Sequence, residues 1–332
     1  MRISVLGAGG WGTTLAIVLY LNGHHVTLWE YRKDYAKALH KSRYNKTYLP
    51  GVFIPEPIKV THDLGEAVEN KHMIIIAVPT QFIRSVMTDV RKIKFGDATF
   101  VSVSKGVEKG SLYTVTQIIR DELDGIDPAN IGVLSGPSHA EEVSRKIPTA
   151  VVAASHDENT TKQIQAAFMT SYFRVYSSDD VLGVELGGAL KNVMAIGAGM
   201  VEGAGFGDNT KALIMTRGIA EISRLGEALG AKKETFTGLS GMGDLIVTCM
   251  SKHSRNRFVG EQLGKGLTLE QVMKNMQMVA EGVETCRGVV SLAEEADVET
   301  PIVDAVYRVL YEHHDPVKAT YELLSRDIEM AH

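Results

Sequence analysis

The sequence has few of the features that mark several classes of protein. Its two cysteines, Cys249 and Cys286, cannot build a disulfide framework and form no CxxC pair. It has no basic excess, since 35 Lys and Arg against 40 Asp and Glu give a net charge of −5, so a nucleic-acid partner is not expected. It also has no long polar or low-complexity tract, which argues against disorder. These absences favour a globular protein of the reducing cytoplasm.

Charged side chains are also missing from Ile3 to Trp29. A signal peptide or a membrane anchor can contain such a run. This one, however, holds four glycines between Gly7 and Gly12, which would weaken a membrane helix. No cleavage site of small residues is obvious. A strand, a tight turn and a helix explain the run better, so we expect no membrane insertion.

The 332 residues are enough for about two domains. Strands alternate with helices in the first half, which predicts an α/β domain with a Rossmann-type, doubly wound, mostly parallel sheet. The predicted strands are Ile3–Leu6, His25–Trp29, Met73–Val78, Thr99–Val103, Ile131–Leu134, Thr149–Ala154 and Phe173–Tyr176. The predicted helices are Thr13–Leu21, Thr80–Lys92, Leu112–Leu123 and Glu158–Met169.

Strand-like runs nearly vanish after about residue 180. The helical patterns there are Val184–Met200, Thr210–Leu229, Leu269–Asn275, Thr285–Glu295 and Ile302–Tyr311. We therefore expect a dinucleotide-binding domain over residues 1–180 and an all-α substrate and catalytic domain over 181–332. The boundary falls within 178–183.

The glycines between the first strand and the first helix form a G-x-G-x-x-G pattern, Gly7 to Gly12. Gly7 would permit the tight turn, Gly9 would let a pyrophosphate approach the backbone, and Gly12 would let helix and strand pack closely. The pyrophosphate would then lie at the positive end of the helix. The alternative is a glycine-rich turn without a ligand, but the strand–turn–helix context favours a dinucleotide.

Two opposing signals follow the second strand. Glu30 lies 18 residues after Gly12, near the place of an acid that binds a ribose 2′-hydroxyl, which favours NAD. Tyr31, Arg32 and Lys33 follow at once, and an arginine there can hold a 2′-phosphate, which favours NADP. A solvated charged loop explains any one of these residues equally well.

Two further motifs follow strand ends, where ligands bind in open α/β sheets. In Ser104-Lys105-Gly106, the lysine can meet an anionic substrate or polarise a carbonyl, although a surface lysine is as plausible. In the segment Ser135 to Ala140, exposed N–H groups could hold a ligand. Alternatively, this segment is a corner at which Ser138 caps a helix over Ala140–Ser144.

Polar residues also interrupt the helical half. Lys191 and Asn192 stand inside a helix of apolar and small residues, where a lysine either reaches solvent or serves a site. Asp244 follows a run of small residues and could pair with a buried lysine. The segment Ser254 to Asn256 could bind a phosphate through its arginine and its N–H groups, or could simply begin a capped helix.

Taken in order, these segments resemble the NAD(P)-dependent glycerol-3-phosphate dehydrogenases of the bacterial type. The resemblance rests on GAGGWGT, VSVSKG, LSGPSHAEE, LGGALKNVMAIGAGM, GMGDL and SRN, and on VAEGVET from Val279 to Thr285. It implies reduction of dihydroxyacetone phosphate to sn-glycerol 3-phosphate with NAD(P)H, for glycerophospholipid synthesis. No metal is expected, because the pairs His24-His25 and His313-His314 lack metal-ligand spacing, and a homodimer in the cytoplasm is a reasonable expectation.

The resemblance also implies roles for individual residues. Lys191 would give the proton to the C2 oxygen, Lys105 would lie beside that oxygen, and Asp244 would orient Lys191. The phosphorylated triose would contact Lys105, Gly136, Ser138, Lys191, Asn192, Asp244, Thr248, Ser254, Arg255 and Asn256. The dinucleotide would contact Gly7, Gly9, Gly10, Trp11, Gly12, Tyr31, Arg32, Lys105, Ala140, Arg255, Val279 and Glu281.

Two other functions remain open at this stage. A 3-hydroxyacid or ketopantoate reductase would share the fingerprint and a lysine on a helix, but the Ser254 to Asn256 segment favours a phosphorylated substrate. A dinucleotide-sensing regulator would need only the fingerprint, so the presence of Lys105, Lys191 and Asp244 disfavours it.

Overall fold

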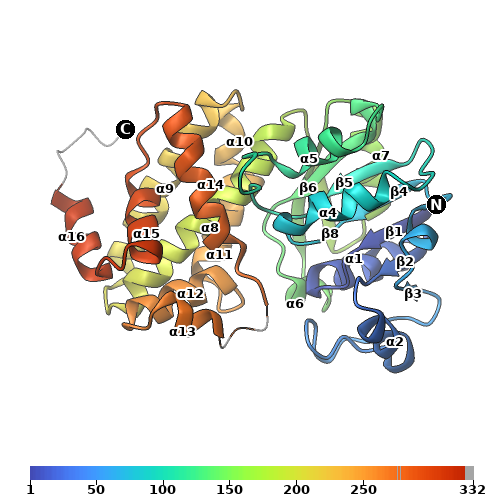
Figure 1. Ribbon diagram of the computed structural model, residues 1–332, viewed down its shortest axis with the longest axis horizontal. Coiled ribbons are helices and arrows are strands. Elements are labelled where there is room, and N and C mark those ends of the chain that lie inside the picture. The colour runs from blue at the N-terminus through green and yellow to red at the C-terminus, as the bar shows by residue number, and fades with distance from the viewer. Residues whose placement is uncertain (275, 277, 326–332) are drawn as a thin grey trace. The chain divides into compact units, whose positions relative to one another are not determined.

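The computed structural model describes residues 1–274, 276 and 278–325. The chain divides into two compact units. The first contains Met1–Glu108 and Tyr113–Glu185. The second contains Lys109–Leu112 and the described part of the chain from Leu186 onward. The first is built around a sheet and the second from helices (Figure 1).

A single eight-stranded sheet forms the centre of the first unit, in the order β3-β2-β1-β4-β5-β6-β7-β8. Its strands are β1 Arg2–Leu6, β2 His25–Trp29, β3 Lys59–Thr61, β4 Met73–Ile76, β5 Thr99–Ser102, β6 Ile131–Ser135, β7 Thr149–Ser155 and β8 Phe173–Ser178. Only β6 and β7 pair antiparallel. The strand order reverses between β1 and β4, and ligands bind at the carboxyl ends of the strands beside such a reversal.

Helices cover both faces of this sheet, because neighbouring residues of a strand point to opposite sides. Met73 and Ile75 pack in a core with α1 and α7, whereas Ile74 and Ile76 pack in a second core with α4 and α5. The helices of this unit are α1 Gly10–Leu21, α2 Lys33–Ser42, α3 Leu64–Val68, α4 Thr80–Val90, α5 Val115–Glu122, the 3₁₀ turn η1 Pro128–Asn130, α6 Ala140–Val143 and α7 Glu158–Phe168. The expected doubly wound α/β fold is confirmed.

The described residues of the second unit form helices and no strand. The elements are α8 Val181–Gly203, α9 Asp208–Ala228, α10 Lys233–Thr237, the π-helix η2 Leu239–Gly243, α11 Asp244–Met250, α12 Arg255–Gly264, α13 Leu269–Lys274, α14 Glu281–Glu295, α15 Pro301–Tyr311 and α16 Pro316–Ser325. Helix α8 begins in the first unit and continues into the second.

Helix α8 is long and apolar enough to cross a membrane, but 94% of its most apolar window is buried. Burial to this extent is typical of a helix in the core of a globular protein. Its glycines explain how closely a second helix approaches, since a Cβ on Gly199 would lie 2.0 Å from the carbonyl oxygen of Arg257. Gly260 of α12 faces α8 in the same way, with a Cβ position 1.9 Å from the oxygen of Ile196. The small residues of α8 therefore let its backbone contact that of α12.

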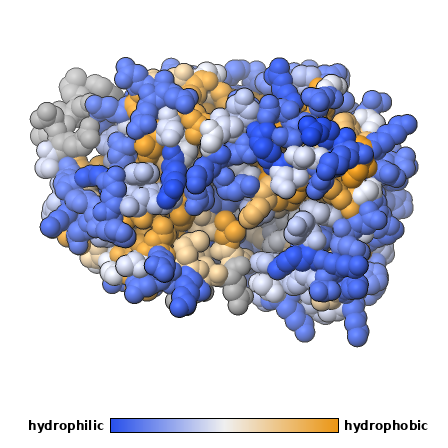
Figure 2. Space-filling model, in the orientation of Figure 1, coloured by the Kyte–Doolittle hydropathy of each residue, from blue (hydrophilic) through white to orange (hydrophobic). Residues whose placement is uncertain are grey.

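Several elements were not predicted from the sequence. They are β3, α2, α3, η1, α10, η2, α11 and α16, whereas α12 was expected only as the alternative of a capped helix after Ser254. The predicted helix over Leu269–Asn275 is present as α13, although Asn275 lies outside the described residues. The tail 326–332 lies outside them as well. Polar and charged side chains cover much of the visible surface of each unit (Figure 2).

Candidate active site

The glycine-rich turn after β1 has the geometry that a dinucleotide requires. Gly7 has a φ of 112°, and a Cβ there would lie 2.7 Å from the carbonyl oxygen of Ala77. A Cβ on Gly12 would lie 1.9 Å from the oxygen of Gly7, so the helix packs directly on the turn. A Cβ on Gly9, in contrast, would meet nothing within 4 Å. The backbone at Gly9 is thus open to a ligand.

The first turn of α1 points its backbone N–H groups toward this open backbone. No side chain caps the helix, and its first turn contains no acidic residue. Trp11 packs at 6.3 Å from the ring of Phe173. An uncapped helix N-terminus beside an open glycine is suited to a pyrophosphate, so these residues fit a nicotinamide dinucleotide.

Two side chains that the sequence analysis missed hold this turn in place. The buried Asn45 donates hydrogen bonds to the carbonyl of Ala8 and to the hydroxyl of Thr13, both at 2.8 Å. The Thr14 hydroxyl lies 2.9 Å from the carbonyl oxygen of Gly10 and 3.3 Å from that of Ala140. It therefore links the glycine-rich turn to the start of α6.

Glu30 and Arg32 form an ion pair after β2. The guanidinium Nε of Arg32 lies 2.9 Å from a carboxylate oxygen of the buried Glu30. The guanidinium also lies 4.4 Å from the ring centre of Tyr35 and donates to the hydroxyl of Tyr48. The Glu30 hydrogen bond raises the pKa of Arg32, so the arginine stays charged. Tyr31 is 78% exposed. The acid and the cation that signal NAD and NADP are thus bonded to each other.

Lys105 lies at the carboxyl end of β5 and reaches the segment after β6. Its amine donates to the carbonyl oxygen of Gly136 at 2.9 Å. The hydroxyl of Ser138 donates to the same oxygen at 2.9 Å, and Gly136 has a φ of 139°. The alternative in which Ser138 caps α6 is wrong, because His139 is the N-cap residue and makes no side-chain cap.

Helix α4 holds the loop that carries Lys105. Arg84 forms a two-pronged bond with Glu108, with Nε at 2.9 Å and Nη2 at 2.8 Å from the carboxylate oxygens. Gln81 donates to the carbonyl of Val107 at 2.8 Å. Three carboxylates, including that of Glu108, raise the pKa of Arg84. The pairing of Arg84 with Glu108, 24 residues apart, leaves no local pattern in the sequence, so it was not predicted.

In the second unit, Lys191 lies on α8 with its amine against α11. The amine is 2.6 Å from a carboxylate oxygen of Asp244 and 2.7 Å from the hydroxyl of Thr248. That hydroxyl lies 2.6 Å from the main-chain oxygen of Asp244. The side chains of Lys191 and Asp244 are 7% and 2% exposed. The predicted contact is therefore present, and the alternative of a solvent-exposed lysine is wrong.

The neighbouring residue, Asn192, is held by the start of α12. Asn256 donates to the side-chain oxygen of Asn192 at 2.9 Å and accepts from the backbone N–H of Gly282 at 3.0 Å. A Cβ on Gly282 would lie 2.6 Å from the main-chain oxygen of Asn192, so only glycine fits there. This arrangement ties α8, α12 and α14 together beside Lys191.

The segment Ser254 to Asn256 does begin a capped helix, as one alternative predicted. The Ser254 hydroxyl accepts from the backbone N–H of Arg257 at 3.2 Å. The side chain of Arg255 takes no part in this cap, and its guanidinium donates to the carbonyl oxygen of Val279 at 2.9 Å. Glu281 follows as the first residue of α14. Capping leaves the Arg255 guanidinium available to bind a phosphate as well, so the two alternatives are compatible.

The site residues expected from the sequence fall into two sets. The first unit contains Gly7, Gly9, Gly10, Trp11, Gly12, Tyr31, Arg32, Lys105, Gly136, Ser138 and Ala140. The second contains Lys191, Asn192, Asp244, Thr248, Ser254, Arg255, Asn256, Val279 and Glu281. The first set suits a dinucleotide. The second contains a buried amine and a guanidinium, which suit proton transfer and the binding of an anion.

Known proteins are similar to this sequence over nearly its full length. Residues 2–161 match the family model described as the NAD-dependent glycerol-3-phosphate dehydrogenase N-terminus, and residues 180–321 match the C-terminus of the same family. A relative from Prosthecochloris aestuarii is 49% identical over 98% of both chains, and one from Fusobacterium nucleatum is 49% identical over 98% of this chain and 97% of its own. Both are named glycerol-3-phosphate dehydrogenase, with NAD(P)+ as cofactor.

A solved structure agrees with the sequence comparisons. The crystal structure of glycerol-3-phosphate dehydrogenase from Coxiella burnetii superposes with a TM-score of 0.94 at 37% identity. The match covers 98% of this chain and 99% of that one. Both halves of the chain and its fold therefore point to one family rather than to a ketopantoate or 3-hydroxyacid reductase. The chain belongs to the family of NAD-dependent glycerol-3-phosphate dehydrogenases.

Proposed function

We propose that the chain reduces dihydroxyacetone phosphate to sn-glycerol 3-phosphate with NAD(P)H, and that it catalyses the reverse reaction. A hydride adds to the C2 carbon of the ketone, the C=O π bond breaks, and the oxygen takes up a proton. The bound nicotinamide supplies the hydride. The observation that carries the proposal is the buried pair of Lys191 and Asp244, with an amine 2.6 Å from a carboxylate.

Lys191 gives the proton to the C2 oxygen. Its charge also stabilises the negative charge that develops on that oxygen, where a preorganised cation has its largest effect. Asp244 and Thr248 hold the amine at 2.6 and 2.7 Å, so its position does not depend on solvent. In the reverse reaction the neutral amine takes the proton from the alcohol. Lys105 adds a second positive charge to substrate binding.

Arg255, with the backbone around Ser254 and Asn256, binds the phosphate of the substrate. Arginine matches phosphate geometry with two parallel N–H donors. The phosphate is remote from the reacting carbon, so its binding energy can orient the ketone. Asn192, which accepts from Asn256 at 2.9 Å, supports the substrate beside Lys191. Gly136 and Ser138 complete the substrate contacts.

The first unit holds the dinucleotide. Gly9 and the N–H groups of the first turn of α1, together with Gly10 and Trp11, would hold the pyrophosphate. Tyr31 and Arg32 contact the adenosine end. Ala140, Val279, Glu281 and Arg255 contribute further contacts. Most of the proposed dinucleotide contacts thus belong to the sheet domain, 1–180, whereas Arg255, Val279 and Glu281 belong to the helical domain, 181–332, to which we assign catalysis.

The active enzyme is a homodimer in the cytoplasm. Three exposed apolar side chains recur every four residues along η2 and α11: Met242 at 37%, Ile246 at 42% and Met250 at 61% exposure. A second copy of the chain would cover this face, as in most soluble oligomers with twofold symmetry. Both cysteines are buried free thiols, as in a reducing compartment. The product then enters glycerophospholipid synthesis.

A spectrophotometric assay at 340 nm tests the function. The purified chain should oxidise NADH or NADPH rapidly when dihydroxyacetone phosphate is added. Dihydroxyacetone without phosphate is the matched control and should react far more slowly, because it lacks the group that Arg255 binds. No oxidation of either cofactor would refute the assigned reaction, and 2-keto and 3-keto acids would be assayed next.

A further inference from the structure

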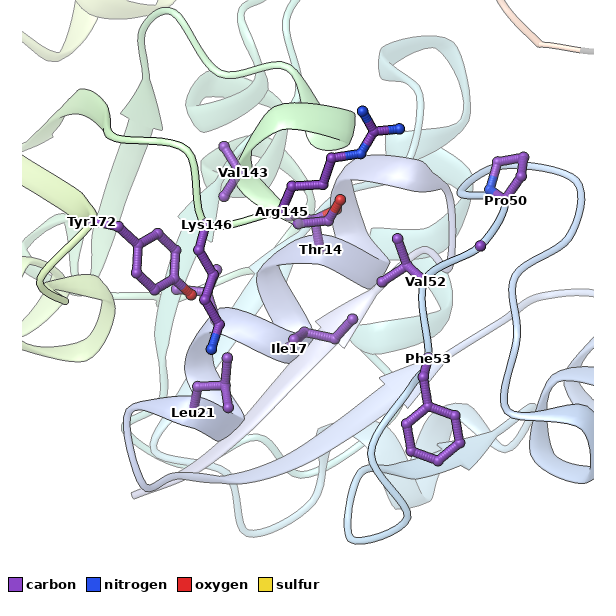
Figure 3. Close-up of a pocket in the computed structure, with 13 residues that line it drawn as sticks. Thr14, Ile17, Leu21, Pro50, Val52, Phe53, Val143, Arg145, Lys146 and Tyr172 are labelled. Carbon is purple, nitrogen blue, oxygen red and sulfur yellow. The ribbon is translucent and has the colours of Figure 1, made fainter.

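A cavity of about 390 Å³ lies in the first unit, on the outer side of α1. Its size is in the range of small-molecule sites. Its walls are the outer face of α1, residues 50–53, residues 143–146 at the end of α6, and Tyr172. Figure 3 shows Ile17 and Leu21 of α1 opposite Val52 and Phe53. Leu21 and Phe53 are 47% and 48% exposed. One part of the cavity is therefore apolar and open to a ligand.

The other part is positively charged. Arg145 and Lys146 line it, and the lining contains no Asp or Glu. In the part of the chain that the structure describes, neither of these side chains has an ion-pair or hydrogen-bond partner. Lys146 has a φ of 61°, in the left-handed region that a lysine rarely adopts. Figure 3 shows its side chain running between Tyr172 and Leu21, while Arg145 runs above Thr14. Two unpaired cations thus border an apolar wall, in a chain whose net charge is −5.

We propose that this cavity binds a single-chain anionic amphiphile, with the anion at Arg145 and Lys146 and the alkyl chain between α1 and residues 50–53. The volume has room for about a dozen water-sized groups, which suits a phosphate or carboxylate with a short chain. An uncharged apolar ligand would leave both cations without a partner, and a free phosphate would leave the apolar wall exposed. Only a molecule that combines both chemistries matches both parts.

The cavity is separate from the dinucleotide contacts but shares structural elements with them. Thr14 lines the cavity and also bonds to the carbonyls of Gly10 and Ala140. A Cβ on Gly10 would lie 2.6 Å from the main-chain oxygen of Tyr48, which is two residues before the 50–53 wall. Dinucleotide and amphiphile therefore occupy different faces of the same segments, and both can be bound at once.

Calorimetric titration with octyl phosphate, below its micelle concentration, tests the proposal. The enzyme is first saturated with NADPH and sn-glycerol 3-phosphate, so that both phosphate-binding sites of the proposed reaction are filled. We expect saturable binding of octyl phosphate at one site per chain. Octanol and inorganic phosphate should each bind at least 10-fold more weakly. No binding of octyl phosphate, or equal binding of either control compound, would overturn the proposal.

Two pairs of variants locate the site. Arg145→Gln with Lys146→Gln should weaken octyl phosphate binding at least 10-fold. The matched control, Lys37→Gln with Lys41→Gln, removes two exposed lysines from α2 and should change the affinity by less than two-fold. Leu21→Ser tests the apolar wall separately and should also weaken binding. Unchanged binding in the Arg145 and Lys146 variant would place the ligand elsewhere and refute the site.

Discussion

The amine of Lys191 lies 2.6 Å from a carboxylate oxygen of Asp244, and both side chains are buried. The two residues come from different helices, α8 and α11, 53 positions apart. Burying two charges is costly unless each is paired and hydrogen-bonded, and Thr248 supplies a second hydrogen bond to the amine. A buried ion pair adds little net stability over apolar packing of similar volume, so stability alone does not explain this pair.

Removing the carboxylate of this pair should destabilise the fold. Asp244→Asn leaves a buried ammonium without its counter-charge, which costs about 3–5 kcal/mol of unfolding free energy. The double variant Lys191→Met with Asp244→Asn should lose less unfolding free energy than the single Asp244→Asn variant, because it no longer contains an uncompensated buried charge. Denaturant unfolding of the two single variants and the double variant measures this coupling. Additive losses would mean that the two side chains do not interact.

Arg255 should matter for binding of the phosphorylated ketone. Arg255→Ala should raise the KM for dihydroxyacetone phosphate at least 10-fold, since a charge-assisted two-pronged bond is lost. Arg255→Lys keeps the charge but not the planar donor pair, so its KM should lie between those of the parent and the alanine variant. Steady-state kinetics at saturating cofactor measures both. An unchanged KM in Arg255→Ala would place the phosphate at other residues.

The ion pair of Glu30 and Arg32 should set the choice between cofactors. Arg32→Gln removes the cation that would meet a 2′-phosphate, so the ratio of kcat/KM for NADPH to that for NADH should fall at least 10-fold. Glu30→Ala removes the acceptor for a ribose 2′-hydroxyl, and that ratio should rise. Parallel assays with the two cofactors give both ratios. If neither variant moves the ratio, the discriminating residues lie elsewhere.

Glu221 should make the stability of the second unit depend on pH. Burial raises the pKa of this carboxyl to about 7, although it accepts hydrogen bonds from the backbone N–H groups of Ile302 and Val303 at 3.0 Å. The folded chain therefore binds a proton more tightly than the unfolded one, whose pKa is near the usual 4.5. The stabilisation that Glu221 contributes is fully present below pH 4.5. It is lost as the pH rises through 7, which lowers the free energy of unfolding by about 3 kcal/mol at most.

Glu221→Gln isolates this effect, because it removes the titration and leaves the other groups in place. The difference in unfolding free energy between parent and variant should decrease as the pH rises from 4.5 to 8. Denaturant unfolding at several pH values measures it. A difference that is constant with pH would show that Glu221 does not titrate in this range.

The sequence predicted the parts of the fold and the site whose signals are local. The strand, turn and helix around Gly7 to Gly12 could be recognised because the glycine spacing and the adjoining apolar runs agree. The need of Lys191 for a partner could be anticipated because it stands among apolar and small residues, whereas Asp244 was named as that partner by the family resemblance. In both cases a few neighbouring residues carry the physical reason.

The parts that were missed depend on distant contacts or on weak patterns. Helix α12 has no strong apolar periodicity, so the sequence indicated it only as an alternative, through its capping residue Ser254. Helix α11 was missed because it follows the π-helix at Gly241-Met242-Gly243, whose sequence resembles a loop. Asn45 stabilises the glycine-rich turn from 37 residues away. Such a bond is formed only after the chain has folded, so nothing near Asn45 in the sequence indicates it.

The most direct test of the central claim is the turnover of Lys191→Ala with dihydroxyacetone phosphate, measured beside its affinity for NADPH. If Lys191 is the proton donor, kcat should fall by on the order of 10² to 10⁴, while the Kd for NADPH stays within about two-fold of the parent. Arg84→Ala serves as a comparison, because it loosens the Lys105 loop and leaves Lys191 in place. Its kcat should fall less than that of Lys191→Ala. A kcat that is unchanged in Lys191→Ala, with NADPH still bound, would contradict the assignment.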